Sequence, residues 1–160
     1  MGANITVTDE RLEGGEPVGS LRVRAVAVQE PRSLEISGAA VANLIDELPL
    51  LGFLAASLGW QMTLRDAGEL RVKESDRIAA TVANLARMGA PIEERADGWH
   101  LESAGMLHGA QLSSFSDHRI AMGCAVAALS AAGASQVEDA RDSVAVSLPE
   151  FWDLLESIAQ

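Results

Sequence analysis

Cysteine is almost absent from this 160-residue chain, which contains a single one, Cys124. One cysteine excludes a disulfide bond within the chain. Its place in the apolar run of residues 120–129 predicts a buried structural thiol rather than a nucleophile. A lone free thiol is typical of a reducing compartment, so we expect a cytoplasmic protein.

Basic residues are also scarce, with 12 lysines and arginines against 23 aspartates and glutamates and a formal net charge of −11. Nucleic acids and anionic membranes both select basic surfaces, so we expect neither as a partner. We also expect no signal peptide, and no apolar stretch is long enough to span a bilayer. If the ligand is an anion, the few basic residues must be concentrated where it binds.

Hydrophobic residues make up 48% of the chain, which indicates a globular protein of one-domain length. The alternation of segments predicts an α/β fold. The expected strands are residues 5–7, 19–26, 34–37, 61–65, 109–112 and 136–138, with a hairpin formed by 91–95 and 99–102. The expected helices are residues 39–44, 48–58, 75–88, 118–131 and 149–158.

The order of these segments predicts an internal repeat. Residues 34–103 follow a complete β-α-β-α-β-β order, whereas residues 109–160 follow β-α-β-α and then stop. Residues 1–33 then form the end of a preceding unit. We therefore expect a fragment of a larger domain built from such units.

Two expected helices, residues 48–58 and 120–129, are apolar nearly all round and should be buried. A buried helix leaves only its ends for polar chemistry. Asp46, the cluster of residues 74–77 and the cluster of residues 117–119 all occupy such ends. If the units stack in one direction, the three ends meet on one face.

Two of these helix ends carry an arginine in the first turn. Ser75 or Asp76 is the expected N-cap before Arg77, and Asp117 is the expected N-cap before Arg119. A cation opposes the helix dipole there, so both arginines are poor choices for stability, and removing either could even stabilise the fold slightly. Free backbone N–H groups and guanidinium groups attract the same phosphate or carboxylate, which favours an anion site.

Four segments together resemble the 5-enolpyruvylshikimate-3-phosphate synthase family. They are LIDELP at 44–49, LRVKESDRI at 70–78, SDHRIAM at 116–122 and VSLPEF at 146–151. The resemblance covers essentially the whole chain, in order and at family-like spacing.

The resemblance implies two similar domains, each built from three β-α-β-α-β-β units around buried helices, with substrates bound between them. This chain is then the C-terminal portion, without the N-terminal domain and without a Lys-Ser phosphate-binding motif. The family transfers the enolpyruvyl group of phosphoenolpyruvate to the 5-hydroxyl of shikimate 3-phosphate and releases phosphate. No metal or organic cofactor takes part, and we expect this chain alone to be inactive.

The resemblance also implies catalytic roles for three residues. Asp46 corresponds to the base that takes the proton of the attacking hydroxyl and also contacts shikimate 3-phosphate. Glu74 corresponds to the acid that protonates the methylene carbon of phosphoenolpyruvate. His118 is expected to support this proton transfer, or else only to cap and pack. Two carboxylates in different surroundings can divide acid and base work in this way.

Substrate contacts follow from the same motifs. The resemblance implies that Lys73 contacts shikimate 3-phosphate and that Arg77 and Arg119 hold phosphoenolpyruvate. Val146 departs from the pattern, because some family members carry a phosphoenolpyruvate-binding lysine there. Two alternatives stay open: the UDP-N-acetylglucosamine enolpyruvyl transferase of the same fold, and a free-standing anion-binding or scaffold module without catalysis.

Overall fold

The computed structural model describes residues 4–24 and 32–158 of the chain. It divides into two compact units, residues 1–30 and residues 31–160. Ala25 and Val26, the last two residues of the strand expected at 19–26, lie outside the described residues.

The first unit is an antiparallel hairpin of β1 (Asn4–Glu13) and β2 (Glu16–Arg24). Gly14 and Gly15 connect the strands with positive φ angles of 61° and 91°. Two successive residues of positive φ form the turn whose twist matches that of a two-residue hairpin, and glycine adopts it without strain. Both strands expected in this part of the chain are present, and both are longer than predicted.

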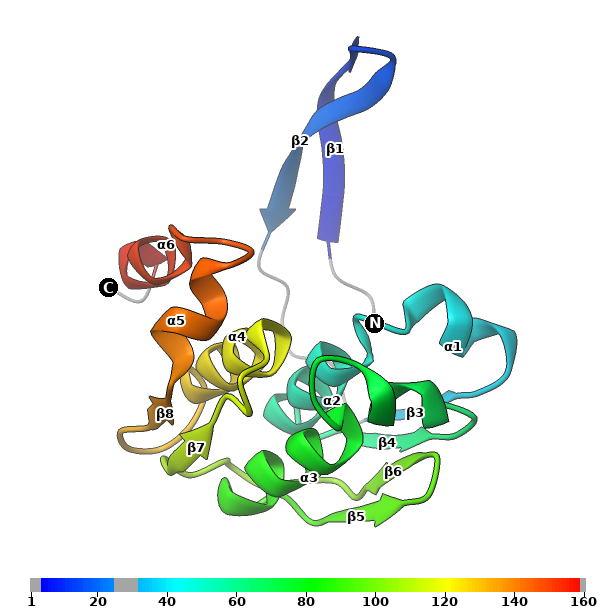
Figure 1. Ribbon diagram of the computed structural model, residues 1–160, viewed down its shortest axis with the longest axis vertical. Coiled ribbons are helices and arrows are strands. Elements are labelled where there is room, and N and C mark those ends of the chain that lie inside the picture. Colours follow the sequence, from blue (N-terminus) through cyan, green and yellow to red (C-terminus); the bar gives the residue numbers. More distant parts are fainter. Residues whose placement is uncertain (1–3, 25–31, 159–160) are drawn as a thin grey trace. The chain divides into compact units, whose positions relative to one another are not determined.

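The second unit contains a mixed four-stranded sheet in the order β3-β4-β6-β5 (Figure 1). The first pair is parallel and the other pairs are antiparallel. The strands are β3 (Ser33–Ile36), β4 (Gln61–Leu64), β5 (Ile92–Arg95) and β6 (Gly98–Leu101). A separate parallel pair consists of β7 (Gln111–Ser113) and β8 (Gln136–Glu138).

Helices connect these strands in the order predicted for residues 34–103. The helices are α1 (Ala39–Leu44), α2 (Leu48–Ser57), α3 (Arg77–Arg87), α4 (His118–Ala128), α5 (Ala140–Ala145) and α6 (Phe151–Ile158). The predicted β-α-β-α-β-β order is confirmed. The assignment of residues 1–33, 34–103 and 109–160 to repeat units stays a prediction. None of the described helices has the length and apolar character needed to cross a membrane.

Two short elements are missing from the sequence prediction. A 3-10 helix, η1 (Gly68–Val72), precedes α3, and the six-residue α5 follows β8. Neither is long enough to show a hydrophobic period, which is the signal that identifies a helix from sequence. One boundary of each of two other helices also differs from its expected place: α4 ends at Ala128 instead of residue 131, and α6 begins at Phe151 instead of residue 149.

The core lies around α2 and α4, which pack side by side in the middle of the second unit (Figure 1). The prediction that residues 48–58 form a buried helix is largely right, since Leu48, Phe53, Ala55 and Ala56 are fully buried, but Leu50 is 40% exposed. The same prediction is only partly right for residues 120–129. Ile120 and Cys124 are fully buried, but Val126 and Leu129 are 40% and 51% exposed.

Candidate active site

The N-termini of α2, α3 and α4 meet at one place, as the sequence predicts. Arg77, the first residue of α3, bonds to Asp46 beside the start of α2 and to Asp117, the N-cap of α4. Arg119 of α4 in turn reaches the start of α2, where its Nη1 donates to the backbone oxygen of Asp46. The three polar segments that the sequence places at separate helix ends therefore form one cluster.

Arg77 is the centre of this cluster and is fully buried. Its Nε donates to Oδ2 of Asp117 at 2.8 Å, Nη1 to Oδ1 of Asp46 at 2.9 Å and Nη2 to Oε2 of Glu74 at 2.6 Å. Burial by itself lowers the pKa of Arg77, but the hydrogen bonds and charges of these carboxylates outweigh it and raise the pKa above its ordinary value. Arg77 is thus permanently charged and paired.

This pairing changes one expectation. From the helix dipole alone, Arg77 is a poor choice for stability, and its removal could even stabilise the fold slightly. In the structure three carboxylates bind the guanidinium directly. We therefore expect removal of Arg77 to be destabilising, because it leaves Asp117 buried without its charge partner.

Asp117 is the buried carboxylate of the cluster, with no exposed surface. Its Oδ1 accepts the backbone N–H of Arg119 at 2.9 Å and so caps α4, while Oδ2 also accepts the hydroxyl of Ser75 at 3.0 Å. Burial by itself raises the pKa of Asp117. The hydrogen bonds and charge of Arg77 have the larger combined effect and hold the pKa below its usual range.

Asp46 and Glu74 are the accessible carboxylates, with side chains 44% and 53% exposed. Asp46 lies among three cations: besides Arg77, Nζ of Lys73 is 3.8 Å from its Oδ1 and Nη2 of Arg119 is 3.9 Å from its Oδ2. Glu74 is held by Arg77 alone among these cations. The two carboxylates therefore share one guanidinium but have different surroundings.

Lys73 does not pair with the adjacent Glu74. Its Nζ lies 2.8 Å from Oε1 of Glu69 in η1, and this hydrogen bond raises the pKa of Lys73. Since Lys73 also approaches Asp46, its ammonium lies at the edge of the cluster where an anion can reach it.

Arg119 and His118 begin α4. Nη1 of Arg119 donates to Oε1 of Glu47 at 2.7 Å as well as to the backbone oxygen of Asp46 at 3.0 Å, and its side chain is 31% exposed. His118 is half-buried, and the described part of the chain offers its ring no hydrogen-bond partner. The structure therefore brings His118 to the cluster without joining it to either carboxylate.

A second network supports the segment that carries Lys73 and Glu74. Asp76 caps α3, because its Oδ1 accepts the N–H of Ala79 at 3.0 Å and its Oδ2 accepts Nη1 of Arg71 at 2.8 Å. Arg71 also donates to the backbone oxygens of Arg95 and Ala96 in the β5–β6 hairpin. Sequence reasoning missed this role of Arg71, which only its place in the 70–78 motif hints at.

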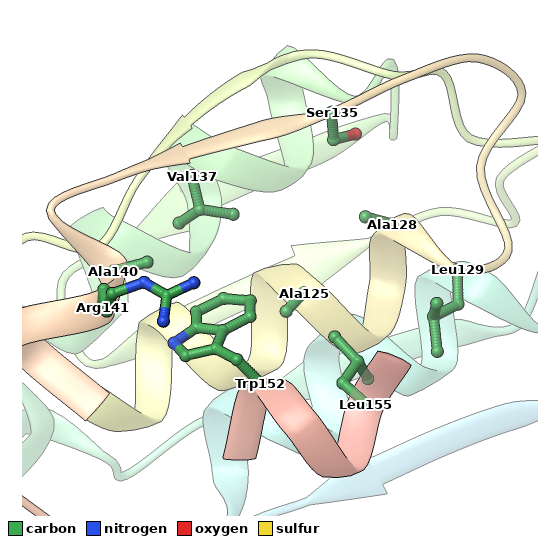
Figure 2. A pocket seen from close by; sticks show the side chains of 9 residues that line it. All are labelled: Ala125, Ala128, Leu129, Ser135, Val137, Ala140, Arg141, Trp152 and Leu155. Atoms are coloured by element: carbon green, nitrogen blue, oxygen red, sulfur yellow. The ribbon is translucent and has the colours of Figure 1, made fainter. Parts of the chain in front are cut away.

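Two hollows lie near α4. The smaller, about 210 Å³, has Asp46, Glu47 and Arg119 at its polar end and Leu50, Met122, Val126, Leu148 and Phe151 along its sides. The larger, about 380 Å³, is lined mainly by apolar residues of α4, α6, β8 and α5, with Arg141 of α5 as the charged side chain among them (Figure 2). No predicted site residue lines the larger hollow, so only the smaller one adjoins the cluster.

Metal binding has no evident site here. Within residues 4–24 and 32–158, no group of three or more His, Cys, Asp or Glu side chains is arranged to hold a metal ion. The expectation that no cofactor takes part stays a prediction.

Comparisons with known proteins identify the family to which this chain belongs. The sequence matches the EPSP synthase (3-phosphoshikimate 1-carboxyvinyltransferase) family over residues 1–155. This chain belongs to the EPSP synthase family. It is 46% identical over 159 residues to the 3-phosphoshikimate 1-carboxyvinyltransferase of Thermosynechococcus vestitus and 47% identical over 158 residues to that of Synechococcus elongatus. Both alignments cover 99% of this chain.

The solved structures agree. An EPSP synthase from Acinetobacter baumannii superposes with a TM-score of 0.85 at 34% identity over 98% of this chain. The α/β fold implied by the resemblance is thus confirmed. The chain spans only 35% of the length of the Thermosynechococcus relative and 36% of the Acinetobacter chain, about a third of a family member.

Proposed function

We propose that this chain supplies the acid–base part of an EPSP synthase, which transfers the enolpyruvyl group of phosphoenolpyruvate to the 5-hydroxyl of shikimate 3-phosphate. A longer protein provides the remaining two-thirds, including the other side of the substrate cleft. The family membership supports the reaction, and the geometry of the Arg77 cluster supports the division of roles.

The observation that carries this proposal is the attachment of Asp46 and Glu74 to one guanidinium, on Nη1 and Nη2 of Arg77. The reaction needs a base that removes the proton of the 5-hydroxyl as its oxygen bonds to C2 of phosphoenolpyruvate, and an acid that protonates the methylene carbon. A proton then leaves the resulting methyl group and re-forms the double bond as the carbon–oxygen bond to phosphate breaks. Asp46 is the base and Glu74 is the acid. Because one rigid group holds both, their separation is set before substrate arrives. His118, the first residue of α4, supports the proton transfer.

Anion binding falls to the cations around these carboxylates. Lys73 contacts shikimate 3-phosphate, and Arg119 exchanges its surface partner Glu47 for phosphoenolpyruvate. Arg77 has each of its three nitrogens on a carboxylate, so it contacts phosphoenolpyruvate only where Asp46 or Glu74 gives way. This arrangement favours Arg119 as the main arginine contact from this part of the enzyme.

The net charge and the single thiol support the expected partners and compartment of this protein. A net charge of −11 confines anion binding to this cluster and disfavours nucleic acid and anionic membranes. The buried, unreactive Cys124 suits a reducing cytoplasm.

Phosphate release tests the function. The complete enzyme that contains this chain is assayed with both substrates, and we expect the 160-residue chain alone to release no phosphate. Asp46→Asn and Glu74→Gln in the complete enzyme should each lower kcat about 10²–10⁴-fold. Glu94→Gln is the matched control, because Glu94 pairs with Arg71 outside the cluster.

Two results would contradict the proposal. A complete native enzyme that releases no phosphate from these substrates rules out the reaction and leaves a binding module without catalysis. Near-normal kcat in Asp46→Asn or Glu74→Gln removes the role of that residue.

A further inference from the structure

We propose that Asp117 is a positioning residue. It binds Nε of Arg77, and so fixes the guanidinium whose other two nitrogens bind Asp46 and Glu74. Its effect on turnover rests on the proposed function, whereas its effect on the geometry does not.

Burial excludes a direct role for Asp117 in substrate contact. Its side chain has no exposed surface, whereas Asp46 and Glu74 are 44% and 53% exposed. Asp117 therefore acts only through the groups it touches. The group that links it to the accessible carboxylates is Arg77, whose Nε it accepts at 2.8 Å and whose Nη2 it accepts at 3.4 Å.

The hydrogen bonds of Asp117 fix its own position first. Oδ1 is held by the N–H of Arg119 at the start of α4, and Oδ2 is held by the hydroxyl of Ser75 in the segment before α3. Asp117 is thus bound to two different elements by hydrogen bonds that do not involve the Arg77 guanidinium. A guanidinium is planar, so fixing Nε and one edge of Nη2 also fixes the directions in which Nη1 and Nη2 point. Those directions are the ones that Asp46 and Glu74 occupy.

Charge reinforces this geometry. The single positive charge of Arg77 is shared among three carboxylates, and Asp117 is the fully buried one. With Asp117 neutral, the two accessible carboxylates would face the whole charge and lose a repulsive neighbour. The other charged or titratable groups around the cluster are Glu47, Glu69, Lys73, His118 and Arg119.

The chain contains a matched control for Asp117. Asp76 is also an N-cap that accepts a backbone N–H with Oδ1 and an arginine with Oδ2, here Ala79 and Arg71. Its arginine continues to Glu94 and to the backbone of the β5–β6 hairpin, away from Asp46 and Glu74. Asp76→Asn therefore removes the same kind of cap and ion pair without touching the link to the accessible carboxylates.

The first test uses the 160-residue chain and needs no activity. Carbon-13 NMR at neutral pH records the carboxyl resonances of Asp46 and Glu74 in the native chain, Asp117→Asn and Asp76→Asn. Asparagine is a good N-cap, so α4 should persist in Asp117→Asn. We expect both resonances to move by more than their line width in Asp117→Asn and to move less in Asp76→Asn. Unchanged resonances in Asp117→Asn overturn the proposal.

The native chain gives a second measurement, which holds even if Asp117→Asn fails to fold. The Nε–H of Arg77 should exchange slowly with water because Asp117 buries and bonds it, whereas the half-exposed Arg119 should exchange quickly. Fast exchange at Arg77 also overturns the proposal.

Turnover tests the consequence in the complete enzyme. We expect Asp117→Asn to lower kcat about 10–100-fold through misplacement of the accessible carboxylates, with smaller changes in KM. Asp76→Asn removes a cap from the segment that carries Lys73 and Glu74 but leaves the contacts of Arg77 in place, so it should lower kcat less than Asp117→Asn does. Native kcat in Asp117→Asn, or an equal loss in the two variants, overturns the positioning role. A native enzyme without turnover fails the proposed function and leaves the NMR result to judge Asp117.

Discussion

Gly123 of α4 lies directly against the ring of Phe53 in α2, where a Cβ atom on Gly123 would stand 2.6 Å from Cδ2 of the ring. This contact sets how closely the two central helices approach. Asp46 precedes α2 and Asp117 caps α4, so the same approach sets the distance across the Arg77 cluster.

Gly123→Ala should destabilise the chain. Alanine is the better helix former by about 1 kcal/mol, but overpacking a buried contact costs about 1–3 kcal/mol. We expect a net loss of about 1 kcal/mol in the free energy of unfolding, measured by urea denaturation. Gly68→Ala is the control, because nothing lies within 4 Å of its added Cβ atom. A Gly123→Ala chain as stable as the native one would show that α2 and α4 can separate freely.

Arg77→Ala and Arg119→Ala should differ sharply in stability. Arg77→Ala leaves the buried Asp117 unpaired, which typically costs about 3–5 kcal/mol in the free energy of unfolding. Arg119 is 31% exposed and pairs at the surface with Glu47, so its loss should cost at most about 1 kcal/mol. Thermal unfolding of the two variants measures the difference, and similar melting temperatures would contradict the structural role of Arg77.

Much of the fold could be predicted because it depends on local patterns. Apolar residues all round 48–58 predict the buried α2, and Asp76 and Asp117 before apolar runs predict the starts of α3 and α4. Stacking of similar units then predicts that the helix N-termini meet. All of these follow from periodicity and capping, which act within a few residues.

The partners of Arg77 could not be predicted in the same way. Asp46 and Asp117 are 31 and 40 residues away in the chain, and no spacing rule shows that both would bind one guanidinium. A local rule, the helix dipole, takes no account of such partners, so it predicts the opposite effect of Arg77 on stability from the one that its ion pairs predict. The exposure of Val126 and Leu129 depends in the same way on which surfaces come to cover α4. The catalytic and binding roles of the site residues stay predictions.

Lowering the pH should reduce the difference in the free energy of unfolding between the native chain and Asp117→Asn. The bonds and charge of Arg77 overcome the opposing effect of burial and keep the pKa of Asp117 below its ordinary value. A carboxylate with a lowered pKa in the folded state stabilises the fold fully above the unfolded pKa of about 3.9 and loses that contribution as pH falls through the folded pKa. The stability advantage of the native chain over Asp117→Asn should therefore be largest near neutral pH and shrink below about pH 4. Urea unfolding of both proteins across this range measures it, and a constant difference would contradict the ion pair.

Cys124 should be inert to thiol reagents in the folded chain. Burial raises its pKa to about 12, so the reactive thiolate is scarcely present at mildly alkaline pH. A chromogenic disulfide reagent should modify it only after denaturation. The control places a cysteine at Val126, on the same helix and 40% exposed, in a Cys124→Ala background. We expect that cysteine to react about 100-fold faster or more, and equal rates would show that α4 opens readily.

The isolated chain should self-associate through the apolar surface of α4 and α6. Val126, Leu129, Leu154 and Ile158 are between 40% and 73% exposed, and side chains of these two helices line one side of the hollow of about 380 Å³ (Figure 2). Exposed apolar patches favour contact with another apolar surface, and in a solution of this chain the available surface is a second copy.

Sedimentation velocity over a range of concentrations measures this association. Leu129→Lys combined with Leu154→Lys should shift the chain toward monomer, because each lysine places a charge in the contact that association would bury. Met106→Lys is the control, since Met106 is 72% exposed outside these helices. A complete enzyme that covers α4 and α6 with the rest of its chain should stay at one sedimentation coefficient where the 160-residue chain does not. A strict monomer at every concentration would show that this surface is too small or too dispersed to bind a second copy.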